Sequence, residues 1–302
     1  MDREKITKKF AEFHDKHYKS LLLIPIIMVV LGFVYLGYFY SVNNDFFYKD
    51  ISLTGGTSAT INTATINPSD LQKAISGKLE EVNIREISDL VTRQQIAVVV
   101  ETKSDELTTK NVLEQYLGYT LDEKNSSFEF TGSTLSNSFY QQLLIAILIA
   151  FVLMSIVVLI QFKTFIPSIA VISSAFADIF MPLVLVDLLG IRISSAGIVA
   201  FLMLIGYSVD TDILLTNRVL RREGKSLNRK IFDSFKTGIT MTLTAIASVV
   251  IALLTIGSFS SVLYQIFLIL AIGLGFDIFN TWLTNVSIIK WYALHKQKKH
   301  EN

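Results

Sequence analysis

The sequence predicts an α-helical polytopic membrane protein: six transmembrane helices, with one small α+β domain of ferredoxin-like pattern between the first and second. Three observations predict it. The 302 residues are 51% hydrophobic, with a mean hydropathy of +0.49, which is unusual for a soluble domain. Six apolar stretches are long enough to cross a hydrocarbon layer about 30 Å thick. One sizeable polar region, residues 41–138, lies between the first two stretches.

The first expected span covers residues 21–40 and follows a basic segment at 1–20. It runs about 20 residues and no small-x-small cleavage site follows it, so we expect a retained helix rather than a signal peptide. The other five spans form a bundle within residues 139–292, and a polar tail follows at 293–302. Their expected limits are 139–161, 165–187, 193–217, 237–257 and 262–292.

The polar region has the element order β-α-β-β-α-β, which is typical of a ferredoxin-like domain. Asn67-Pro68-Ser69-Asp70 has the pattern of a helix N-terminus with proline at the first position. Alternating or Val-rich runs predict strands at 57–62, 83–91, 95–101 and 127–130, and helical spacing predicts helices at 71–79 and 104–116. About 95 residues are enough for a modest core.

The positive charges predict the orientation. The two termini, the connections after the second and fourth spans, and Lys290 near the end of the last span account for 18 of the 27 Lys and Arg residues, and the opposite side carries nine. Both termini are therefore expected in the cytoplasm and residues 41–138 outside. Near the N-terminus, Ile6, Phe10 and Phe13 recur at helical intervals among lysines. They fit an interfacial amphipathic helix, although a solvated basic leader is equally compatible.

Four aspartates, Asp178, Asp210, Asp212 and Asp277, fall inside the expected spans. An aspartate near the centre of a membrane helix costs roughly 2.5 to 3.5 kcal/mol, so each needs a polar lining, a partner or a proton. Asp210 and Asp212 differ by about 200° around a helix and cannot face the same neighbour. We expect one to face the bundle interior and the other to approach the cytoplasmic interface.

Polar residues also recur at helical spacing in the fifth and sixth spans. The sixth carries Gly273, Asp277, Asn280, Thr281 and Thr284, and the fifth carries Thr237, Thr240, Thr244 and Ser248. Small and hydroxyl residues allow close helix approach and interhelical hydrogen bonds. The two interpretations, packing alone or part of an ion path, both stay open at this point.

Composition argues against an enzyme and against a bound metal or cofactor. The chain has no cysteine, and its four histidines lie in the polar terminal segments. Gly273-Leu274-Gly275-Phe276-Asp277 comes close to the Gly-x-Gly-Asp pattern of intramembrane aspartyl proteases, but the aspartate is one residue late and no Tyr-Asp partner exists. No P-loop is present, so any driven transport must take its energy from a gradient or a partner.

These features together resemble the SecD/SecF family of protein-export proteins, within the resistance-nodulation-division superfamily. Leu53-Thr54-Gly55-Gly56-Thr57 looks like the motif that opens the family's outer domain, and Asp178 matches its third-helix aspartate. Gly206-Tyr207-Ser208-Val209-Asp210-Thr211-Asp212, with Arg218 beyond it, matches the fourth-helix signature. Asp277 and Asn280-Thr281-Trp282 make archaeal SecF proteins the nearest likeness.

The chain departs from bacterial members of the family at several positions. They usually have Asn-Asp-Thr where this chain has Asp210-Thr211-Asp212, so the aspartate implicated in proton use is displaced by one residue. Asp210 falls where the sister subunit SecD has an aspartate, and it is therefore the expected buried functional carboxylate, with Asp212 as an interfacial neighbour. Ala177 replaces a histidine, and Lys236-Thr237-Gly238 replaces an arginine early in the fifth helix.

The resemblance implies a multi-pass cell-membrane subunit that, with SecD, assists late steps of Sec-dependent export, coupled to a proton or ion gradient. Its implied partners are SecD, the Sec translocon, the translocating preprotein and membrane lipid, with no nucleic acid. The ion-coupling candidates are Asp210, Asp212, Asp178, Asp277 and Arg218. The alternatives are a half-transporter exporting a small molecule or lipid, and a structural role that only stabilises SecD.

Overall fold

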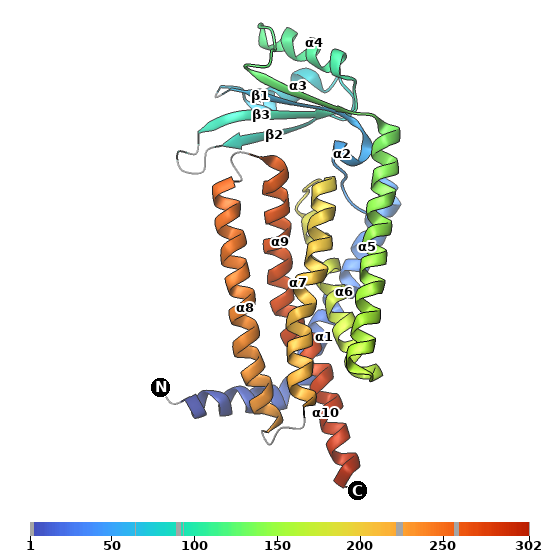
Figure 1. Cartoon of the computed structure of the whole chain (residues 1–302). Coiled ribbons are helices and arrows are strands. Elements are labelled where there is room, and N and C mark those ends of the chain that lie inside the picture. The colour runs from blue at the N-terminus through green and yellow to red at the C-terminus, as the bar shows by residue number, and fades with distance from the viewer. Residues whose placement is uncertain are drawn as a thin grey trace.

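The computed structural model contains a helical bundle with an α/β domain across one end (Figure 1). It describes residues 3–301 except 64, 89–91, 93, 222–225 and 257–259, and it describes side chains for those residues other than 3–17, 256, 261 and 297–301. Six helices in the described part are long and apolar enough to cross a membrane, which confirms the expected number. The end of the bundle opposite the α/β domain is called the distal end below.

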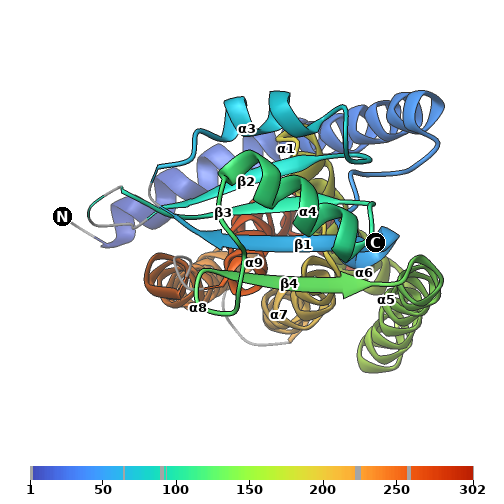
Figure 2. The ribbon, with the colours of Figure 1, turned by 90° about the horizontal axis from the view of Figure 1, so that it is seen from above.

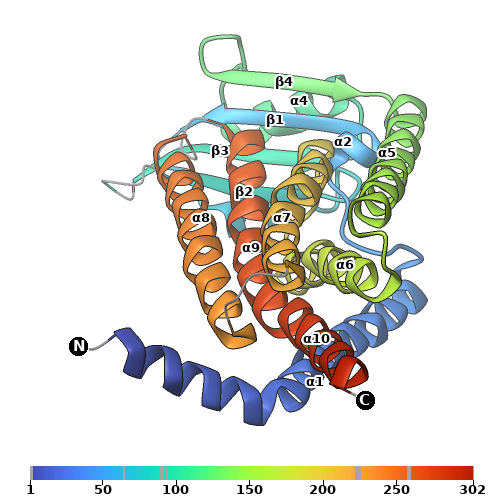
Figure 3. The same ribbon diagram turned by 60° about the horizontal axis from the view of Figure 1, so that its bottom comes forward.

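The first helix, α1 (Arg3–Asn43), is 41 residues long. Its N-terminal part lies across the distal end of the bundle, and the remainder runs alongside α6 (Figures 1 and 3). Its candidate membrane span, Tyr18–Asn43, starts three residues before the expected limit.

The remaining helices form the bundle, with α6 and α7 the most buried. They are α5 (Ser133–Phe162), α6 (Phe165–Leu188), α7 (Ser195–Leu220), α8 (Leu227–Ile256) and α9 (Ser261–Asn280), which continues through a π-helical turn, η1 (Thr281–Asn285), into α10 (Val286–Glu301). α8 begins ten residues before the expected span, because Leu227–Lys236 extends the helix with an amphipathic segment before the apolar part begins.

The α/β domain contains the expected element order, interrupted before β1 by a short helix, α2 (Ile51–Thr54). Its elements are β1 (Gly56–Asn62), α3 (Pro68–Ile75), β2 (Asn83–Ser88), β3 (Gln95–Thr102), α4 (Glu106–Leu117) and β4 (Ser126–Thr131). The strand order is β2-β3-β1-β4 and every pairing is antiparallel, so β3 separates β1 from β2, which is compatible with the expected ferredoxin-like pattern. The last part of the expected strand 83–91 lies outside the described residues.

One face of the sheet is covered by α3 and α4, and the other faces the ends of the bundle helices (Figures 1 and 2). The core of the domain lies under the two helices and includes Ile61, Leu71, Val98, Val100 and Leu113. Asn67 caps α3 by accepting a hydrogen bond from the Ser69 backbone, as expected from the sequence.

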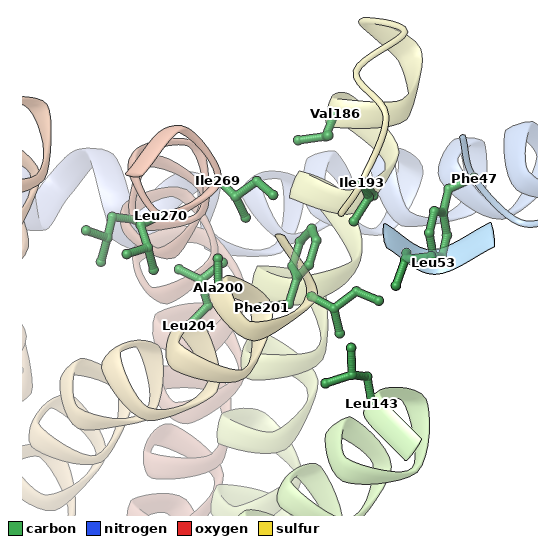
Figure 4. Close-up of a cluster of buried hydrophobic side chains, with 12 residues drawn as sticks. Phe47, Leu53, Leu143, Val186, Ile193, Ala200, Phe201, Leu204, Ile269 and Leu270 are labelled. Carbon is green, nitrogen blue, oxygen red and sulfur yellow. The ribbon is translucent and has the colours of Figure 1, made fainter. Parts of the chain in front are cut away.

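The linker between α1 and the α/β domain is bound to the α6–α7 connection. Lys49 and Ile193 form an isolated parallel β-bridge, in which Ile193 N–H donates to Tyr48 O at 2.7 Å and Asp50 N–H donates to Ile193 O at 3.0 Å. Phe47 of this linker and Leu53 of α2 pack into a buried cluster with residues of α5, α6, α7 and α9 (Figure 4). The α/β domain is therefore fixed to the bundle by backbone pairing as well as apolar packing.

Candidate functional site

Three of the four intramembrane aspartates lie inside the bundle, and two of them share a hydrogen-bond donor. Asp178 of α6, Asp212 of α7 and Asp277 of α9 are each at most 1% exposed. Within the described part of the chain, no ion pair involves any of them. Nor do the described residues contain a group of His, Cys, Asp and Glu side chains that could hold a metal ion. The cluster is therefore a set of carboxyl groups held by neutral donors.

Asp210 is exposed on the outer face of α7, so the expectation that it is the buried carboxylate and Asp212 the interfacial neighbour is wrong. The rotation of α7 decides this, because the two residues lie on opposite faces. α7 packs against α6 and α9 through the face that carries Leu204, Ser208 and Asp212. A Cβ atom added to Gly273 of α9 would lie 2.2 Å from Leu204 Cδ1, which shows how closely these two helices approach.

Asp178 binds α7 and α9 at once. Its Oδ2 accepts a hydrogen bond from the Ser208 hydroxyl, and its Oδ1 accepts one from the Asn280 side-chain amide at 2.6 Å. Both partners are buried polar residues. Asp178 therefore satisfies both of its oxygens across two helix interfaces, which is the arrangement a buried carboxyl group needs.

Asp212 and Asp277 share one hydroxyl group. Thr281 Oγ1 lies 2.9 Å from Asp212 Oδ1 and 3.4 Å from Asp277 Oδ1. Asp212 Oδ1 also accepts from the Asn285 amide at 2.8 Å, and Asp277 Oδ2 accepts from the Thr242 hydroxyl at 3.2 Å. A hydroxyl has a single hydrogen to donate, so Thr281 cannot donate to both carboxylates at the same time. A proton on either carboxyl group would satisfy the second contact.

The π-helical turn η1 places the donors of α9 around Asp212. Single π-helical turns are rare and frequently occur at functional sites. Here the turn begins at Thr281 and ends at Asn285, and both side chains reach Asp212 Oδ1. Sequence reasoning identified Thr281 but missed Asn285, which follows Thr281 by four residues and Asp277 by eight.

Arg218 is not part of this cluster. Its Nη1 donates to the Asp233 backbone carbonyl at 2.7 Å and to Thr237 Oγ1 at 2.9 Å, both on α8. Among the described residues, no hydrogen bond or ion pair joins it to an intramembrane aspartate. Arg218 thus ties the distal end of α7 to α8.

The signature at 206–212 divides between two faces of α7. Ser208 and Asp212 point into the bundle, whereas Gly206, Tyr207 and Asp210 are exposed. Large apolar residues one and two turns earlier, Met203 and Val199, are exposed on the same side. The exposed strip, residues 199, 203, 206, 207 and 210, is called the α7 outer face below. It places a carboxylate on the surface of a candidate membrane span.

The Gly-Gly-Thr motif forms the joint between the α/β domain and α5. Gly55 and Gly56 have φ of +84° and +140°, which favour glycine. A Cβ atom would lie 2.4 Å from Ser133 Cα at Gly55 and 2.2 Å from the Thr102 carbonyl oxygen at Gly56. Thr57 is fully buried. The structure thus gives this motif a packing role.

The sequence model for "Protein export membrane protein SecD/SecF, C-terminal" matches residues 108–295. The chain belongs to the SecD/SecF family. It is 37% identical to the protein-export membrane protein SecF of Methanocaldococcus jannaschii over 290 residues, covering 94% of this chain and 99% of that one. It is 34% identical to SecF of Methanolacinia petrolearia over 277 residues, covering 91% and 94%.

The fold is also that of a solved SecD/SecF family member. The crystal structure of SecDF from Thermus thermophilus, described as a translocon-associated membrane protein, matches with a TM-score of 0.73 at 18% identity. The match covers 92% of this chain but 38% of the SecDF chain, so this protein spans about two fifths of that longer one. The likeness supports the arrangement of six helices and an α/β domain in this SecD/SecF family member.

Proposed function

We propose that the chain is a SecF-type accessory subunit of the Sec export machinery, non-enzymatic, and that it works with a SecD partner late in translocation. The observation that carries the proposal is the buried carboxyl cluster in a chain related to SecF over nearly its full length. Stable charges are expensive at this depth, and a cluster without a cationic partner among the described residues is suited to gaining and losing a proton. The proton gradient would be the energy source.

Asp212 is the proposed centre of the proton step, in place of Asp210. Adding a proton to Asp212 or Asp277 changes which group Thr281 donates to, and so changes the contact between α7 and α9. The N-terminus of α7 directly follows Ile193, which is paired with the linker of the α/β domain. A shift of α7 would therefore move that linker. This is the proposed route from proton to α/β domain.

The α7 outer face is the proposed contact with SecD. An exposed aspartate within a membrane span needs a polar or cationic partner, and Asp210 lies there beside Gly206, whose surroundings are open. The likeness to the SecDF crystal structure supports a SecD partner in the same membrane complex. Sec translocon and preprotein contacts belong to the same proposal, with the α/β domain as the part that meets the emerging chain.

The proposed location is the cell membrane, with both termini in the cytoplasm and the α/β domain outside, as the lysine and arginine distribution favours. The chain has no cysteine, so single cysteines can report on topology. A membrane-impermeant maleimide should label Gly77→Cys in intact cells and should label Lys163→Cys only after lysis. The reverse pattern would overturn the orientation.

The proton step is tested by co-reconstituting the chain with SecD and the Sec translocon and measuring preprotein export under an imposed proton gradient. Asp212→Asn should abolish the gradient-dependent part of export. Asp210→Asn is the matched control, since it makes the same change two residues away on the opposite face. It should keep the gradient dependence and weaken SecD co-purification. Undiminished gradient-dependent export by Asp212→Asn would refute the proton step.

A further inference from the structure

A groove lies between α1 and α10 at the distal end of the bundle, away from the carboxyl cluster. Its volume is about 320 Å³, and it is lined by three residues of α1 and three of α10: Tyr18, Lys19, Leu22, Ser287, Ile288 and Trp291. The two helices contact each other here (Figure 3). The exposed wall of the groove is mostly apolar, but polar groups are also present.

Polar groups are gathered at this groove. Ser287 is 2% exposed, and its hydroxyl has no hydrogen-bond partner among the described residues. A buried hydroxyl without a partner is uncommon and points to a ligand with an acceptor. Lys19 is exposed at the rim. Lys290 is 1% exposed, and its ammonium nitrogen lies 5.9 Å from the centre of the Tyr18 ring, which adds a second positive charge beside the groove.

The groove lies at a membrane boundary. Tyr18 is the first residue of the first candidate span, and Trp291 lies five residues before the end of the last one, Lys296. Tyrosine and tryptophan concentrate at the headgroup level of a bilayer, and Leu22 and Ile288 continue toward the hydrocarbon. One ligand with an anionic head and an apolar tail would match both parts of the groove.

We propose that the groove binds an anionic phospholipid, with its phosphate at Lys19 and Ser287 and an acyl chain along Leu22 and Ile288. Basic pockets between membrane helices bind acidic headgroups in this way. A neutral peptide segment would fill the apolar part but would offer no anionic group to Lys19. The ligand occupies the leaflet at the distal end, which is the cytoplasmic leaflet in the orientation proposed above.

Trp291 lines the groove and serves as the probe. The chain has two tryptophans, and Trp282 is buried against Phe235, so Trp282→Phe leaves Trp291 as the sole tryptophan. The purified full-length variant is placed in vesicles in which brominated phosphatidylglycerol or brominated phosphatidylcholine replaces part of the lipid, and quenching of Trp291 fluorescence is measured. No SecD or translocon is needed, so the result is independent of the export proposal.

Phosphatidylglycerol should bind in the groove with at least about fivefold higher affinity than phosphatidylcholine, because each lysine near the surface contributes about that factor. Lys19→Ala should lower the preference by about fivefold. Lys163→Ala, which removes an exposed lysine from the distal end of α5, should leave it unchanged. Equal quenching by the two lipids, or a preference unaffected by Lys19→Ala, would overturn the proposal.

Two further conditions of the quenching experiment distinguish the lipid from other possible occupants of the groove. Excess inorganic phosphate should leave the quenching unchanged, because the acyl chain is part of the site; displacement by phosphate would show an anion site rather than a lipid site. Co-reconstituted SecD should also leave the phosphatidylglycerol preference in place. Loss of the preference with SecD would show that a partner helix fills the groove in the complex and would overturn the lipid proposal.

Discussion

The Asn285 side-chain amide donates to Oδ1 of Asp212 at 2.8 Å and also lies 3.4 Å from the backbone carbonyl oxygen of Asp212. One side chain therefore contacts both the carboxyl group and the backbone of the same residue on a neighbouring helix. Asn285 is the last residue of η1. A change at Asp212 is consequently passed to the point where α9 becomes α10.

Thr281→Val should destabilise the protein by about 1 to 3 kcal/mol, because it keeps the shape of the side chain but removes the donor that Asp212 and Asp277 share. Unfolding of the purified protein in detergent measures this. Thr240→Val is the matched control, since Thr240 is exposed and, among the described residues, its hydroxyl donates only to the Lys236 carbonyl one turn back. It should stay within about 0.5 kcal/mol of wild type.

Gly273→Ala should destabilise the bundle by about 1 to 3 kcal/mol, because the added methyl group meets buried Leu204 and forces α7 and α9 apart. Its Cβ would lie 2.9 Å from Leu204 Cγ. Gly275→Ala, two residues along the same helix, meets nothing within 4 Å and should be neutral or slightly stabilising. Equal effects of the two substitutions would contradict the close approach of the helices.

Tyr35→Phe should cost about 1 kcal/mol, since it removes a hydrogen bond to a buried acceptor. The Tyr35 hydroxyl donates to Asp187 Oδ2 at 2.8 Å, and Asp187 also accepts from the Tyr48 backbone at 2.7 Å. Tyr38→Phe removes an exposed hydroxyl from the same helix and should be silent. Thermal unfolding of both variants, measured side by side, decides the point.

Glu101 should make the α/β domain less stable as the pH rises. It lines the cavity between the domain and the bundle. Burial and the neighbouring Asp50 charge raise the pKa of Glu101, while Arg85 and Asn83 partly oppose this. The folded state therefore holds the proton more tightly than the unfolded state. The stabilisation is complete below the ordinary glutamate pKa and is lost as pH rises through the raised value.

The comparison that isolates this effect uses Glu101→Gln, whose stability relative to wild type should increase as the pH rises across that window. Hydrogen exchange of β3 amides in the full-length protein measures it. Glu123→Gln removes an exposed carboxylate from the same domain and serves as the charge control. If the difference in stability between wild type and Glu101→Gln does not change with pH, the raised pKa of the buried Glu101 carboxyl group is contradicted.

The sequence was sufficient for the six spans and for the order of strands and helices along the α/β domain, because long apolar runs and alternating strands are local signals. The rotation of α7 was harder, since apolar residues cover both its faces and the usual amphipathic contrast is missing. A usable signal was present. Ser208, Asp212 and Thr216 follow i, i+4, i+8 spacing and are all buried, whereas Asp210 is accompanied on its face by Met203 and Tyr207.

The π-helical turn could not be predicted in the same way. It depends on how α9 fits between α6, α7 and α8, and no residue in 281–285 demands it by itself. α-Helical spacing from Asp277 correctly selected Thr281, and one more step of four residues would have selected Asn285. The partnership of Arg218 with α8 likewise depends on tertiary packing, because Asp233 contributes its backbone carbonyl rather than its side chain.

Because Lys49 pairs with Ile193 just before α7 begins, a rotation of α7 about Asp212 would act on the linker to the α/β domain. From Asp212 to Ser195 the helix is about 26 Å long, so a swing of about 5° around Asp212 displaces its far end by about 2 Å. Such a displacement exceeds what the 2.7 and 3.0 Å backbone hydrogen bonds at Ile193 can tolerate. The linker must then follow the helix or detach from it. The α/β domain is thus joined to the end of α7 that such a swing would displace most.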